Sequence, residues 1–430
     1  MPKEYDPLLN SDVPSATSDD STHDDDQEGS DDVAMPYKQS PFSCVFNFVN
    51  TSLGSGVLTL PFDLMVAGYA LGIGITFTFC LLSMASYYML IKTANYSHRF
   101  QYDAVSDKIF PKYVGIIATT ASILFSCGCV ISYVIVIRDN FFFFGETQTL
   151  YRNLLLWGIM VVLILPLCFL PSLESLKFNS YFIIIVIIYL AFVTVYTFFS
   201  KLASGEAPHP TVVPINKSLS FIQAFPLTTQ AFNSQYNFLN LYRELHSRKK
   251  NGPKVVNWTL LIITVIYMTI GVFGYLTFGS TTESDILKNL AEEGSILTQI
   301  ANVGMILLMI CHYPLPVYAL RKSIEGAIFK TDAYENKKVQ YLISTMIVVI
   351  ASLIGTFLSS IDNVLDFTSS LAGGTLGFII PGMFFWKLAR NNHIMSQMVG
   401  GIMMIVVGII ITSLGFGMAV YKWIVKPFMK

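Results

Sequence analysis

Residues 49–61 read VNTSLGSGVLTLP and lie inside the first long apolar run of the chain. A segment that only anchors a protein in a membrane consists of residues such as Leu, Val, Ile and Ala. Polar groups and helix-weakening glycines are costly in hydrocarbon, yet this stretch holds an Asn, two Thr, two Ser, two Gly and a Pro. The segment is therefore either packed against small-residue neighbours or is a helix that is broken for a function.

The composition indicates a polytopic membrane protein. Of the 430 residues, 53% are apolar and 13% are charged, and the mean hydropathy is +0.56, which lies outside the range of soluble globular proteins. Residues 1–40 differ, because they hold eleven acids against Lys3 and Lys38 and almost no large apolar side chains. We expect this segment to be a disordered acidic tail. All six cysteines lie in apolar runs, so no disulfide framework is expected.

Eleven runs without charged residues are each long enough to cross about 30 Å of hydrocarbon. They cover residues 39–62, 64–91, 113–137, 153–172, 178–200, 218–242, 255–282, 294–320, 339–361, 367–386 and 394–421. Asp63 alone separates the first two runs, which predicts a tight turn at that position. The pattern therefore predicts an all-α membrane protein with eleven transmembrane helices in residues 41–425.

The distribution of basic residues predicts the orientation. If the N-terminus is cytosolic, the loops on the cytosolic side hold 17 Lys and Arg residues, and the other loops and the C-terminus hold 8. This bias follows the positive-inside rule and supports a cytosolic N-terminus. Asn216 begins an Asn-Lys-Ser sequon in an outer loop and is a candidate for glycosylation.

The sixth run resembles the first in being interrupted. Residues 220–242 read SFIQAFPLTTQAFNSQYNFLNLY, in which Pro226 is followed by several polar residues. The first and sixth spans correspond to each other in two five-span halves, 41–200 and 218–386, and residues 394–421 form an eleventh span. Paired interrupted spans indicate an inverted-repeat transporter with its site near the midplane. The alternative is that the Gln and Asn side chains of the sixth span only bond between helices.

Broken helices also indicate what such a site would bind. The freed N–H groups at a half-helix N-terminus suit a substrate carboxylate, and freed carbonyls suit an ammonium group or a cation. The small residues of SSLAGGTLGFIIPG, 369–382, permit close approach to a neighbouring helix. Thr368, Ser369 and Ser370 therefore either reach the site or serve packing.

Several motifs resemble those of a known family. FNFVNTSLGSGVLTLPFDLMVAGYALGI, residues 46–73, resembles the first-span signature of the amino acid/auxin permease family, and is most similar to its sodium-coupled neutral amino acid transporter branch. LNLYREL at 239–245 and YPLPVYALR at 313–321 resemble the ends of the sixth and eighth spans. The resemblance covers Pro41 to about Tyr421. It implies a LeuT-type 5+5 inverted repeat, here with one extra helix, that moves amino acids with Na⁺ or H⁺.

The resemblance also implies which residues form the site. The substrate-binding candidates are small or polar residues of the two broken spans: Thr51, Gly54, Ser55, Gly56, Thr229, Gln230 and Asn233. Asn50 matches an Asn that contributes to ion binding in the sodium-coupled branch, so Na⁺ at Asn50 is the one metal contact considered, and no cofactor is expected. The family's Cys-His pair in the sixth span is replaced here by Ser234-Gln235, which leaves the substrate preference open.

His312 stands where the sodium-coupled branch has a Thr. Na⁺ prefers hard oxygen ligands over imidazole, whereas a His can take up a proton between about pH 5 and pH 8. We therefore consider His312 a candidate for proton coupling. The alternative is a neutral His that is bonded to a backbone carbonyl near Pro314 and Pro316.

The function expected from these features is secondary active transport of small neutral amino acids, as a symport with H⁺ or Na⁺. The alternative is a transport-like amino acid sensor that signals through its cytosolic tail. An enzyme is not expected, because the sequence shows no metal-ligand cluster and no nucleophile–base pair, and no nucleic acid partner is expected. The expected partners are the amino acid substrate and the lipid bilayer.

The tail carries a candidate sorting signal. EYDPLLN fits the acidic dileucine pattern through Glu4, Leu8 and Leu9, and it resembles endosomal and lysosomal signals that cytosolic clathrin adaptors recognise. This favours an endolysosomal or vacuolar membrane as the location, with the plasma membrane as the alternative.

Overall fold

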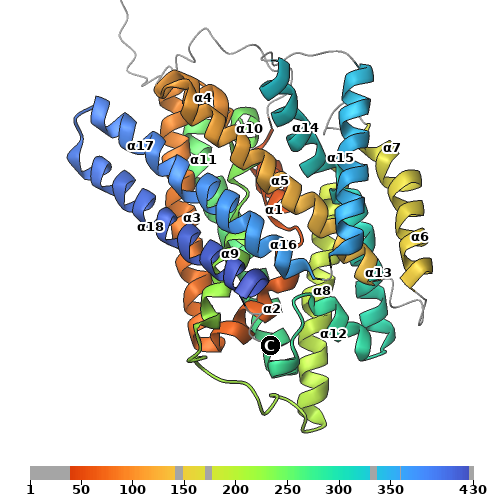
Figure 1. Ribbon diagram of the computed structural model, residues 1–430. Helices are drawn as coiled ribbons and strands as arrows, with labels where there is room; N and C mark the ends of the chain where they lie inside the picture. The colour runs from red at the N-terminus through yellow and green to blue at the C-terminus, as the bar shows by residue number, and fades with distance from the viewer. Residues whose placement is uncertain (1–38, 141–148, 170–176, 330–336, 359, 426–430) are drawn as a thin grey trace, which may run out of the picture. The chain divides into compact units, whose positions relative to one another are not determined.

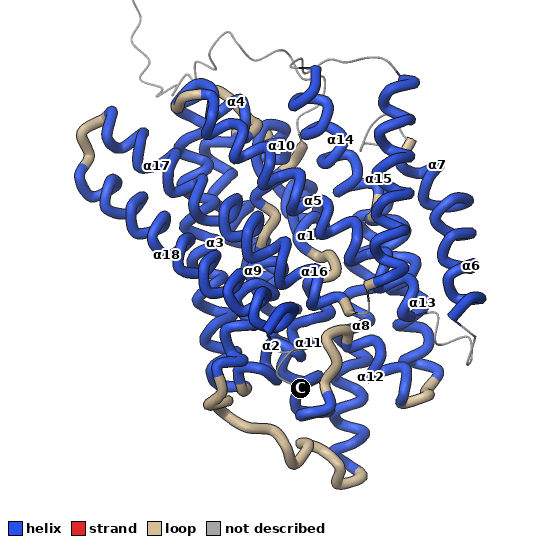
Figure 2. Tube along the Cα trace, viewed as in Figure 1, coloured by secondary structure: helices blue, strands red, loops and turns tan. Residues whose placement is uncertain are grey.

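The computed structural model describes residues 39–140, 149–169, 177–329, 337–358 and 360–425. The chain divides into two units, Met1–Pro36 and Tyr37–Lys430. The first unit lies outside the described residues, and with it the candidate sorting signal at Glu4, Leu8 and Leu9. The described secondary structure of the second unit is helical, as Figure 2 shows, apart from one isolated bridge between Gln39 and Leu245.

Most of the described helices follow one another with short connections, and the longest described loop joins α8 to η4 (Figure 1). The first half of the unit contains α1 Pro41–Ser52, α2 Gly56–Ala67, α3 Tyr69–Ser97, α4 Tyr102–Ile109, α5 Lys112–Asn140, α6 Thr149–Ile159, the π-helical η2 Met160–Ile164, α7 Leu165–Cys168 and α8 Lys177–Ala203. The second half contains η4 Leu219–Gln223, α9 Ala224–Phe232, α10 Gln235–Glu244, α11 Arg248–Phe278, η5 Gly279–Thr281, α12 Ile286–Glu292, α13 Ile296–His312, α14 Pro314–Phe329, α15 Lys337–Phe357, α16 Ile361–Thr368, η6 Ser369–Gly373, η7 Thr375–Ile379 and α17 Ile380–Asn391. The chain then continues into α18 Met395–Val420 and η8 Tyr421–Val425.

Nine helical segments of the described chain are long and apolar enough to cross a membrane. They are Tyr69–Ser97, Lys112–Asn140, Tyr151–Cys168, Tyr181–Ala203, Arg248–Thr281, Ile296–Gly326, Lys337–Phe357, Ile361–Asn391 and Met395–Trp423. Residues 41–67 and 224–244 are instead pairs of short helices, which is where the sequence predicts interrupted spans. If each pair crosses once, the total is eleven, and that count stays a prediction.

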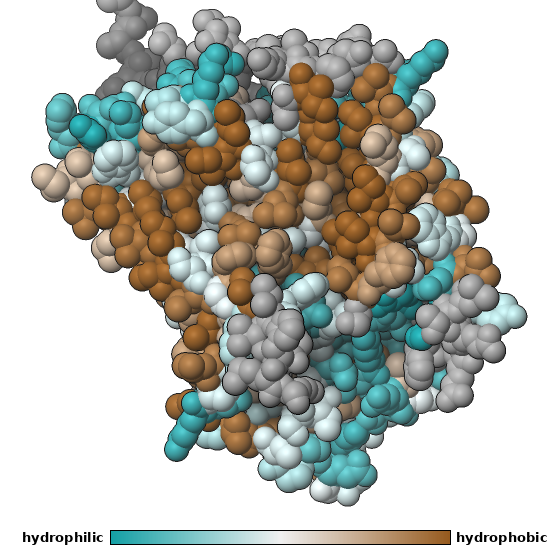
Figure 3. Space-filling model, in the orientation of Figure 1, coloured by the Kyte–Doolittle hydropathy of each residue, from teal (hydrophilic) through white to brown (hydrophobic). Residues whose placement is uncertain are grey.

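The surface of the bundle suits a bilayer. On the face shown in Figure 3, hydrophobic residues cover the middle, and hydrophilic residues gather toward the upper and lower margins. Large apolar side chains such as Ile185, Phe192 and Leu261 are exposed on α8 and α11. Exposed apolar area on this scale is costly in water and is favourable in hydrocarbon, so the described helices form an all-α membrane protein.

The predicted turn at Asp63 is wrong. Asp63 lies inside α2, which continues to Ala67, and its side chain is buried. The turn comes five residues later at Gly68, whose φ is +86°. A Cβ on Gly68 would lie 2.7 Å from the carbonyl oxygen of Pro214, so only glycine allows this conformation and this close approach. A charged residue marks the end of a span only where it faces water, and Asp63 does not.

The loop that packs on this turn contains the candidate glycosylation site. The N–H of Asn216 donates to the carbonyl of Ala67 over 2.8 Å, and the Asn216 side chain accepts a hydrogen bond from the N–H of Ser218 over 3.1 Å. Asn216 is half-buried. Its glycosylation stays a prediction.

The eighth predicted span is continuous but is kinked at its middle. α13 ends at His312 and α14 begins at Pro314, because a proline has no N–H for the helix ladder and its ring clashes with the preceding turn. The N–H of Tyr313 still donates to the carbonyl of Met309 over 2.9 Å. His312 therefore lies at the last position before the kink.

The two interrupted pairs lie at the centre of the packing. α2 packs against α3, α9 and α11, and α9 packs against α2, α3 and η6, while α5 packs against α14, α15 and α16. α17 and α18 form an antiparallel hairpin at the left of Figure 1. We call the face where α1 begins and α10 ends the N-terminal face, and the face where α2 ends and α9 begins the opposite face.

Candidate functional site

The first helix break separates α1 from α2. α1 ends at Ser52 and α2 begins at Gly56, and Leu53 between them has a non-helical φ of −83° and ψ of 78°. No side chain caps the N-terminus of α2. Within the break, the N–H of Gly54 donates to the carbonyl of Ser52 over 3.1 Å, and the N–H groups of Val57 and Leu58 donate to the carbonyls of Gly54 and Ser55 over 3.4 and 3.2 Å. The N–H groups of Ser55 and Gly56, at the start of α2, lie outside the regular ladder of the helix.

The second break separates α9 from α10 in the same way. α9 ends at Phe232, Asn233 has a non-helical φ of −90° and ψ of 84°, and α10 begins at Gln235. The side chain of Ser234 does not cap α10, because its hydroxyl bonds elsewhere. Both breaks are buried, so each freed backbone group needs a partner from the protein or from a ligand.

The two breaks touch each other. The hydroxyls of Ser52 and Ser234 are 2.8 Å apart and share a hydrogen bond. Beside them the helices α2 and α9 cross closely, since a Cβ on Gly56 would lie 2.9 Å from the Cα of Ala231. The glycine at position 56 is therefore needed for this crossing, whatever else it does.

Two buried tyrosines donate hydrogen bonds to backbone carbonyl oxygens at the helix breaks. The Tyr267 hydroxyl of α11 lies 2.9 Å from the carbonyl oxygen of Ser52 and 2.7 Å from that of Ala231. The Tyr87 hydroxyl of α3 lies 2.7 Å from the Ser234 hydroxyl and 3.3 Å from the carbonyl oxygen of Phe232. Both tyrosines therefore hold the ends of the first half-helices in place.

A chain of hydrogen bonds links the first break to α5 and α13. The hydroxyl of Ser55 lies 2.7 Å from that of Ser132. The next residue, Tyr133, places its hydroxyl 2.8 Å from Nδ1 of His312, and Nε2 of His312 lies 3.0 Å from the carbonyl oxygen of Asn50. His312 is buried, and it joins the eighth predicted span to the end of α1.

The partners of His312 fix its neutral tautomer. A carbonyl oxygen only accepts, so Nε2 carries the hydrogen and donates to Asn50. Nδ1 of the neutral ring then accepts from the Tyr133 hydroxyl. A proton added at Nδ1 would reverse that bond, because a hydroxyl can also accept. The predicted alternative of a carbonyl near Pro314 and Pro316 is wrong about the partner, since the carbonyl belongs to Asn50 of another span.

The substrate candidates of the sixth span face η6. The Ser369 hydroxyl donates to Oε1 of Gln230 over 2.6 Å, and Nδ2 of Asn233 donates to the carbonyl of Gly373 over 3.0 Å. Oδ1 of Asn233 is buried and has no hydrogen-bond partner among the described residues. Ser369 therefore reaches the second break, whereas the hydroxyl of Thr368 bonds within its own helix, to the carbonyl of Val364.

Thr51 and Thr229 are held by their own helices. The Thr51 hydroxyl donates to the carbonyl of Asn47 over 2.9 Å, and the Thr229 hydroxyl donates to the carbonyl of Phe225 over 2.7 Å. Gly54 contacts the Tyr133 hydroxyl so closely that a Cβ would lie 2.6 Å from it. The structure thus brings Gly54, Ser55 and Asn233 to the breaks and gives both threonines a local bond.

The sequence prediction missed the side chains that the other helices supply. Tyr87, Ser132, Tyr133 and Tyr267 lie in three different continuous spans, and all four are buried. Their positions in apolar runs carry a weak signal, because a tyrosine deep in a span must find a partner for its hydroxyl. Which partner it finds depends on the packing.

Hydrogen bonds at the N-terminal face join the start of α1 to the end of α10. The N–H of Gln39 donates to the carbonyl of Glu244 over 2.7 Å, and the N–H of His246 donates to the carbonyl of Gln39 over 3.0 Å. The Gln39 side chain also contacts the carboxylate of Glu244 and accepts from Asn47 over 2.7 Å. The two broken spans are therefore joined at this face as well as at their breaks.

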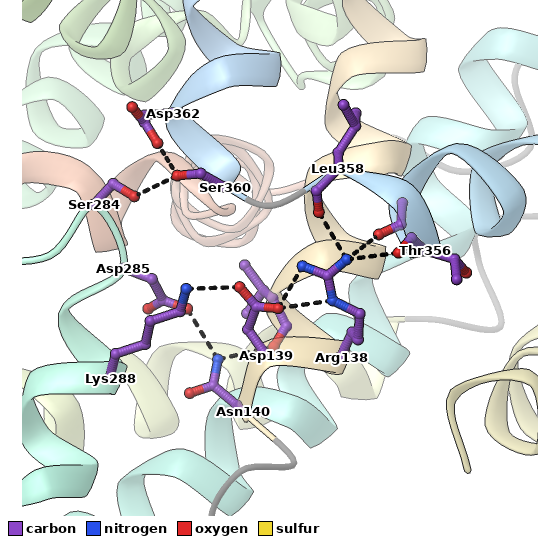
Figure 4. Close-up of polar contacts among 12 residues, drawn as sticks. Arg138, Asp139, Asn140, Ser284, Asp285, Lys288, Thr356, Leu358, Ser360 and Asp362 are labelled. Atoms are coloured by element: carbon purple, nitrogen blue, oxygen red, sulfur yellow. Dashed lines mark hydrogen bonds and ion pairs between the residues drawn. The ribbon is translucent and has the colours of Figure 1, made fainter. Parts of the chain in front are cut away.

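A network of hydrogen bonds and ion pairs lies at the opposite face (Figure 4). Arg138 at the end of α5 donates to the carbonyls of Gly355, Thr356 and Leu358 at the end of α15. Asp139 accepts from Arg138 and pairs with Lys288 of α12 over 2.7 Å. These bonds join three segments that are far apart in the sequence.

Asp285 is the titratable centre of the same network. It caps α12 by accepting from the N–H of Leu287, and it accepts from Asn140 over 2.9 Å. Burial raises the pKa of Asp285 to about 6, and the hydrogen bonds and the charge of Lys288 only partly oppose this effect. The charges of Asp139 and Asp285 raise the pKa of Lys288 despite its partial burial.

The described residues contain no group of three or more His, Cys, Asp or Glu that could hold a metal ion. A Na⁺ ion at the first break would compete for the carbonyl oxygen of Asn50, which His312 already engages. A Na⁺ ion needs several oxygen ligands, as other hard cations do. A carbonyl oxygen has two lone pairs, so the bond to His312 leaves one for an ion, and the other oxygen ligands would have to come from neighbouring groups.

Comparison with known families identifies the chain. Residues 37–425 match the family model described as "Transmembrane amino acid transporter protein". The chain belongs to this family, the amino acid/auxin permease family, as the first-span motif predicted. Its members are transporters and not enzymes.

Several curated proteins align along most of the chain. "Amino acid transporter AVT6E" of Arabidopsis thaliana is 23% identical over 399 residues, which are 87% of this chain and 82% of the relative. "Vacuolar amino acid transporter 5" of Schizosaccharomyces pombe is 25% identical over 81% of this chain and 85% of its own length. "Sodium-coupled neutral amino acid symporter 2" of Danio rerio is 21% identical over 88% and 82%.

Solved structures support the fold. The structure of MhsT in complex with L-phenylalanine matches with a TM-score of 0.56 at 12% identity, over 90% of this chain and 100% of that one. A manganese transporter of Eremococcus coleocola matches with a TM-score of 0.59 at 13% identity, over 88% and 87%. The predicted LeuT-type fold is confirmed. At such low identity the likeness concerns the fold alone.

Proposed function

We propose that this protein is a symporter that carries small neutral amino acids together with H⁺ or Na⁺. The proposal rests on one observation above all: the two helix breaks are buried and joined by the Ser52–Ser234 hydrogen bond, and no side chain caps the half-helices that follow them, α2 and α10. In inverted-repeat transporters the substrate binds at such a pair of breaks. Membership in the amino acid transporter family supplies the substrate class.

Each end of an amino acid has a suitable partner at the breaks. Its carboxylate would bind the backbone N–H groups at Ser55 and Gly56, where the helix dipole of α2 favours a negative charge. Its ammonium group would donate to Oδ1 of Asn233, a buried acceptor without a described partner. This assignment uses the two breaks together.

A small and neutral substrate side chain fits the surroundings. The seven substrate candidates carry no charge, so a charged substrate side chain would be buried there without a counter-ion, which is costly. The aromatic rings of Tyr87, Tyr133 and Tyr267 are buried around the breaks. Bulky side chains around the breaks favour a small substrate side chain over a large one.

We propose that His312 couples transport to the ion. Protonation at Nδ1 would turn the Tyr133 hydroxyl into an acceptor, and its freed hydrogen would then point toward other groups beside Gly54. A change of the ring's charge would in this way reach the unwound segment of the first span. Under the Na⁺ alternative, the ion binds at Asn50 and His312 has a structural role.

The location that we propose is an endolysosomal or vacuolar membrane with the N-terminus in the cytosol, and the plasma membrane is the alternative. A relative described as a vacuolar amino acid transporter supports this location. The acidic dileucine pattern at Glu4, Leu8 and Leu9 would supply the sorting signal through clathrin adaptors. Replacement of both leucines by alanine should move the protein to the plasma membrane, as seen by surface labelling.

The decisive experiment is uptake of labelled amino acids into proteoliposomes that contain the purified protein, with and without a Na⁺ gradient and a pH gradient. Uptake driven by the pH gradient alone would support H⁺ coupling, and uptake that needs Na⁺ would support the alternative ion. Binding without uptake under any gradient would contradict transport and support the sensor alternative.

Two variants of His312 test its role in the same assay. His312→Gln should lose the pH dependence of uptake, and His312→Thr should exchange it for a dependence on Na⁺ or lose coupling. If His312→Gln keeps the pH dependence of the wild type, His312 is not the proton site.

A further inference from the structure

Asp63 is a buried carboxyl group that the function proposed above does not use. It lies in α2, two turns beyond the first break, and its side chain is 1% exposed. Its Oδ2 accepts from the Thr228 hydroxyl of α9 over 3.1 Å. Its Oδ1 is buried and has no hydrogen-bond partner among the described residues.

Two further acids and one base lie beyond Asp63 toward the opposite face. Asp366 of α16 acts on Asp63 electrostatically. Lys422 of η8 contacts the carboxylate of Asp362, and it lies 3.0 Å from Oδ2 of Asp366. Nε2 of Gln223 donates to Oδ2 of Asp366 over 3.1 Å. We call Asp63, Asp362, Asp366 and Lys422 the acidic cluster.

The short helices that pack on α2 bring no unpaired charge to this cluster. α9 and η4 contain no ionisable residue. Asp285, which caps α12, bonds to Asn140, and Lys288 of α12 pairs with Asp139. Glu292, the last residue of α12, is exposed.

The long helices that pack on α2 also bring no counter-ion. The one Lys of α3, Lys92, lies over the ring of Phe385 toward the N-terminal face. The Lys and Arg residues of α11 stand in residues 248–254, at its N-terminal-face end. Tyr267 bonds to the breaks, and the Tyr275 hydroxyl accepts from the N–H of Val213. The described helices that pack on α2 therefore supply no counter-ion to Asp63, and Lys422 pairs with Asp362 and Asp366.

The charges of the acidic cluster do not balance when every member is ionised. Three carboxylates against one ammonium leave two negative charges in a buried region, which is strongly unfavourable. Lys422 bonds to Asp362 and Asp366, and Gln223 bonds to both as well. Asp63 has a single hydroxyl as its partner, so it is the member least able to remain ionised.

We propose that Asp63 is a proton-binding site that holds a proton in the arrangement described here and releases it when α2 parts from α9 and water reaches the carboxyl. The proton binds a carboxylate oxygen of Asp63 and leaves to water, so no other reactant is needed. This inference rests on the proposed transport function and adds to it a proton site distinct from His312.

Infrared difference spectroscopy of the purified full-length protein tests the protonation without any transport. A carboxylic acid has a C=O stretch that is separate from the carboxylate bands. At neutral pH we expect such a band in the wild type and its loss in Asp63→Asn, whose amide is nearly isosteric with the protonated acid. The control Glu283→Gln, which removes an exposed acid from the same face, should keep the band. A wild-type spectrum without the band, or a band that is as intense in Asp63→Asn as in the wild type, would overturn the proposal.

Proton movement during transport tests the coupling. In proteoliposomes with a pH-sensitive dye inside, Asp63→Asn should keep amino acid counterflow and lose the proton movement that accompanies uptake, and Asp63→Glu should restore it. Asp63→Asn with the proton movement of the wild type would refute a role for Asp63 in coupling. If Asp63→Asn fails to fold, the proposal is tested by the carboxylic acid band of the wild type and by the proton movement of Asp63→Glu.

The two tests separate failure of this proposal from failure of the transport function. A carboxylic acid band that depends on Asp63, in a protein that shows no uptake under any gradient, would support the proton site and contradict the proposed function. Uptake without an Asp63-dependent band would support transport and refute the proton site. Loss of proton movement in His312→Gln alone, with Asp63→Asn unaffected, would assign coupling to His312 and overturn the role of Asp63.

Discussion

Substitution of Gly56 by Ala tests whether the close crossing of the two broken helices is required. The new Cβ would lie 2.9 Å from the Cα and 3.0 Å from the backbone N of Ala231, distances at which real Cβ atoms are hardly ever found. Both contacts are backbone atoms of α9, so no side chain can turn aside and the two helices must separate. Overpacking of this kind costs about 1–3 kcal/mol, and the better helix propensity of Ala returns at most about 1 kcal/mol.

We therefore expect Gly56→Ala to lower the stability of the described arrangement by about 1–2 kcal/mol. Because about 1.4 kcal/mol changes an equilibrium tenfold, uptake should fall by about one order of magnitude if transport passes through this arrangement. The assays are thermal unfolding of the detergent-solubilised protein, followed by intrinsic fluorescence, and uptake into proteoliposomes.

Gly74→Ala is the matched control. Gly74 lies in the second turn of α3, and a Cβ there would meet nothing within 4 Å. This variant should unfold at the temperature of the wild type or slightly above it, since Ala stabilises helices relative to Gly by about 0.5–1 kcal/mol. If Gly56→Ala behaves like Gly74→Ala in both assays, the crossing is not tight and the reasoning is refuted.

Three more substitutions test the contacts around the site and at the opposite face. Tyr267→Phe removes a hydroxyl that donates to two buried carbonyls, and it should lower the free energy of unfolding by about 1–3 kcal/mol. The control is Tyr88→Phe, because the Tyr88 hydroxyl bonds at a half-exposed position. Its effect in the same thermal assay should be much smaller. The pKa of Asp285 is raised from 3.8 to about 6, so the folded state binds the proton more tightly than the unfolded state does. The free energy of unfolding should therefore fall by about 3 kcal/mol as the pH rises through this window. Asp285→Asn should remove that fall in unfolding curves recorded from acidic to neutral pH. Arg138→Lys leaves one ammonium group in place of a guanidinium that reaches three carbonyls. This change should lower the free energy of unfolding by about 2 kcal/mol. An unchanged unfolding temperature would show that the packing of α15 on α5 does not depend on these bonds.

The positions of the helix breaks were predictable because they depend on local chemistry. Gly54 and Gly56 weaken a helix within the chain itself at the first break. In the sixth span the break falls among the predicted polar residues, at Asn233 and Ser234, whereas Pro226 lies inside α9, near its start. The family motif around Asn50 predicted the LeuT-type fold, and the structure and the comparisons confirm this fold. The sites of substrate and ion binding stay predictions.

The partners of these residues were not predictable from the sequence. His312 was a candidate by its type, but its bond to Asn50 depends on how α13 meets α1. Tyr87 and Tyr267 looked like ordinary members of apolar runs, and they hold the ends of both broken helices. A hydrogen bond between residues that are 215 positions apart, such as that of Tyr267 to Ser52, leaves no periodic trace in the sequence.

The sequence by itself determined the all-helical membrane class, the approximate spans and the two interrupted helices, since hydrophobic length and helix-breaking residues act over one or two turns of chain. The tertiary structure decided the environment of each polar group. Asp63 illustrates the difference: in the sequence its charge predicted a turn at the membrane surface, and in the fold Thr228 and the packing of α9 bury it within α2. Burial depends on which helices surround a residue, and these helices come from distant parts of the chain.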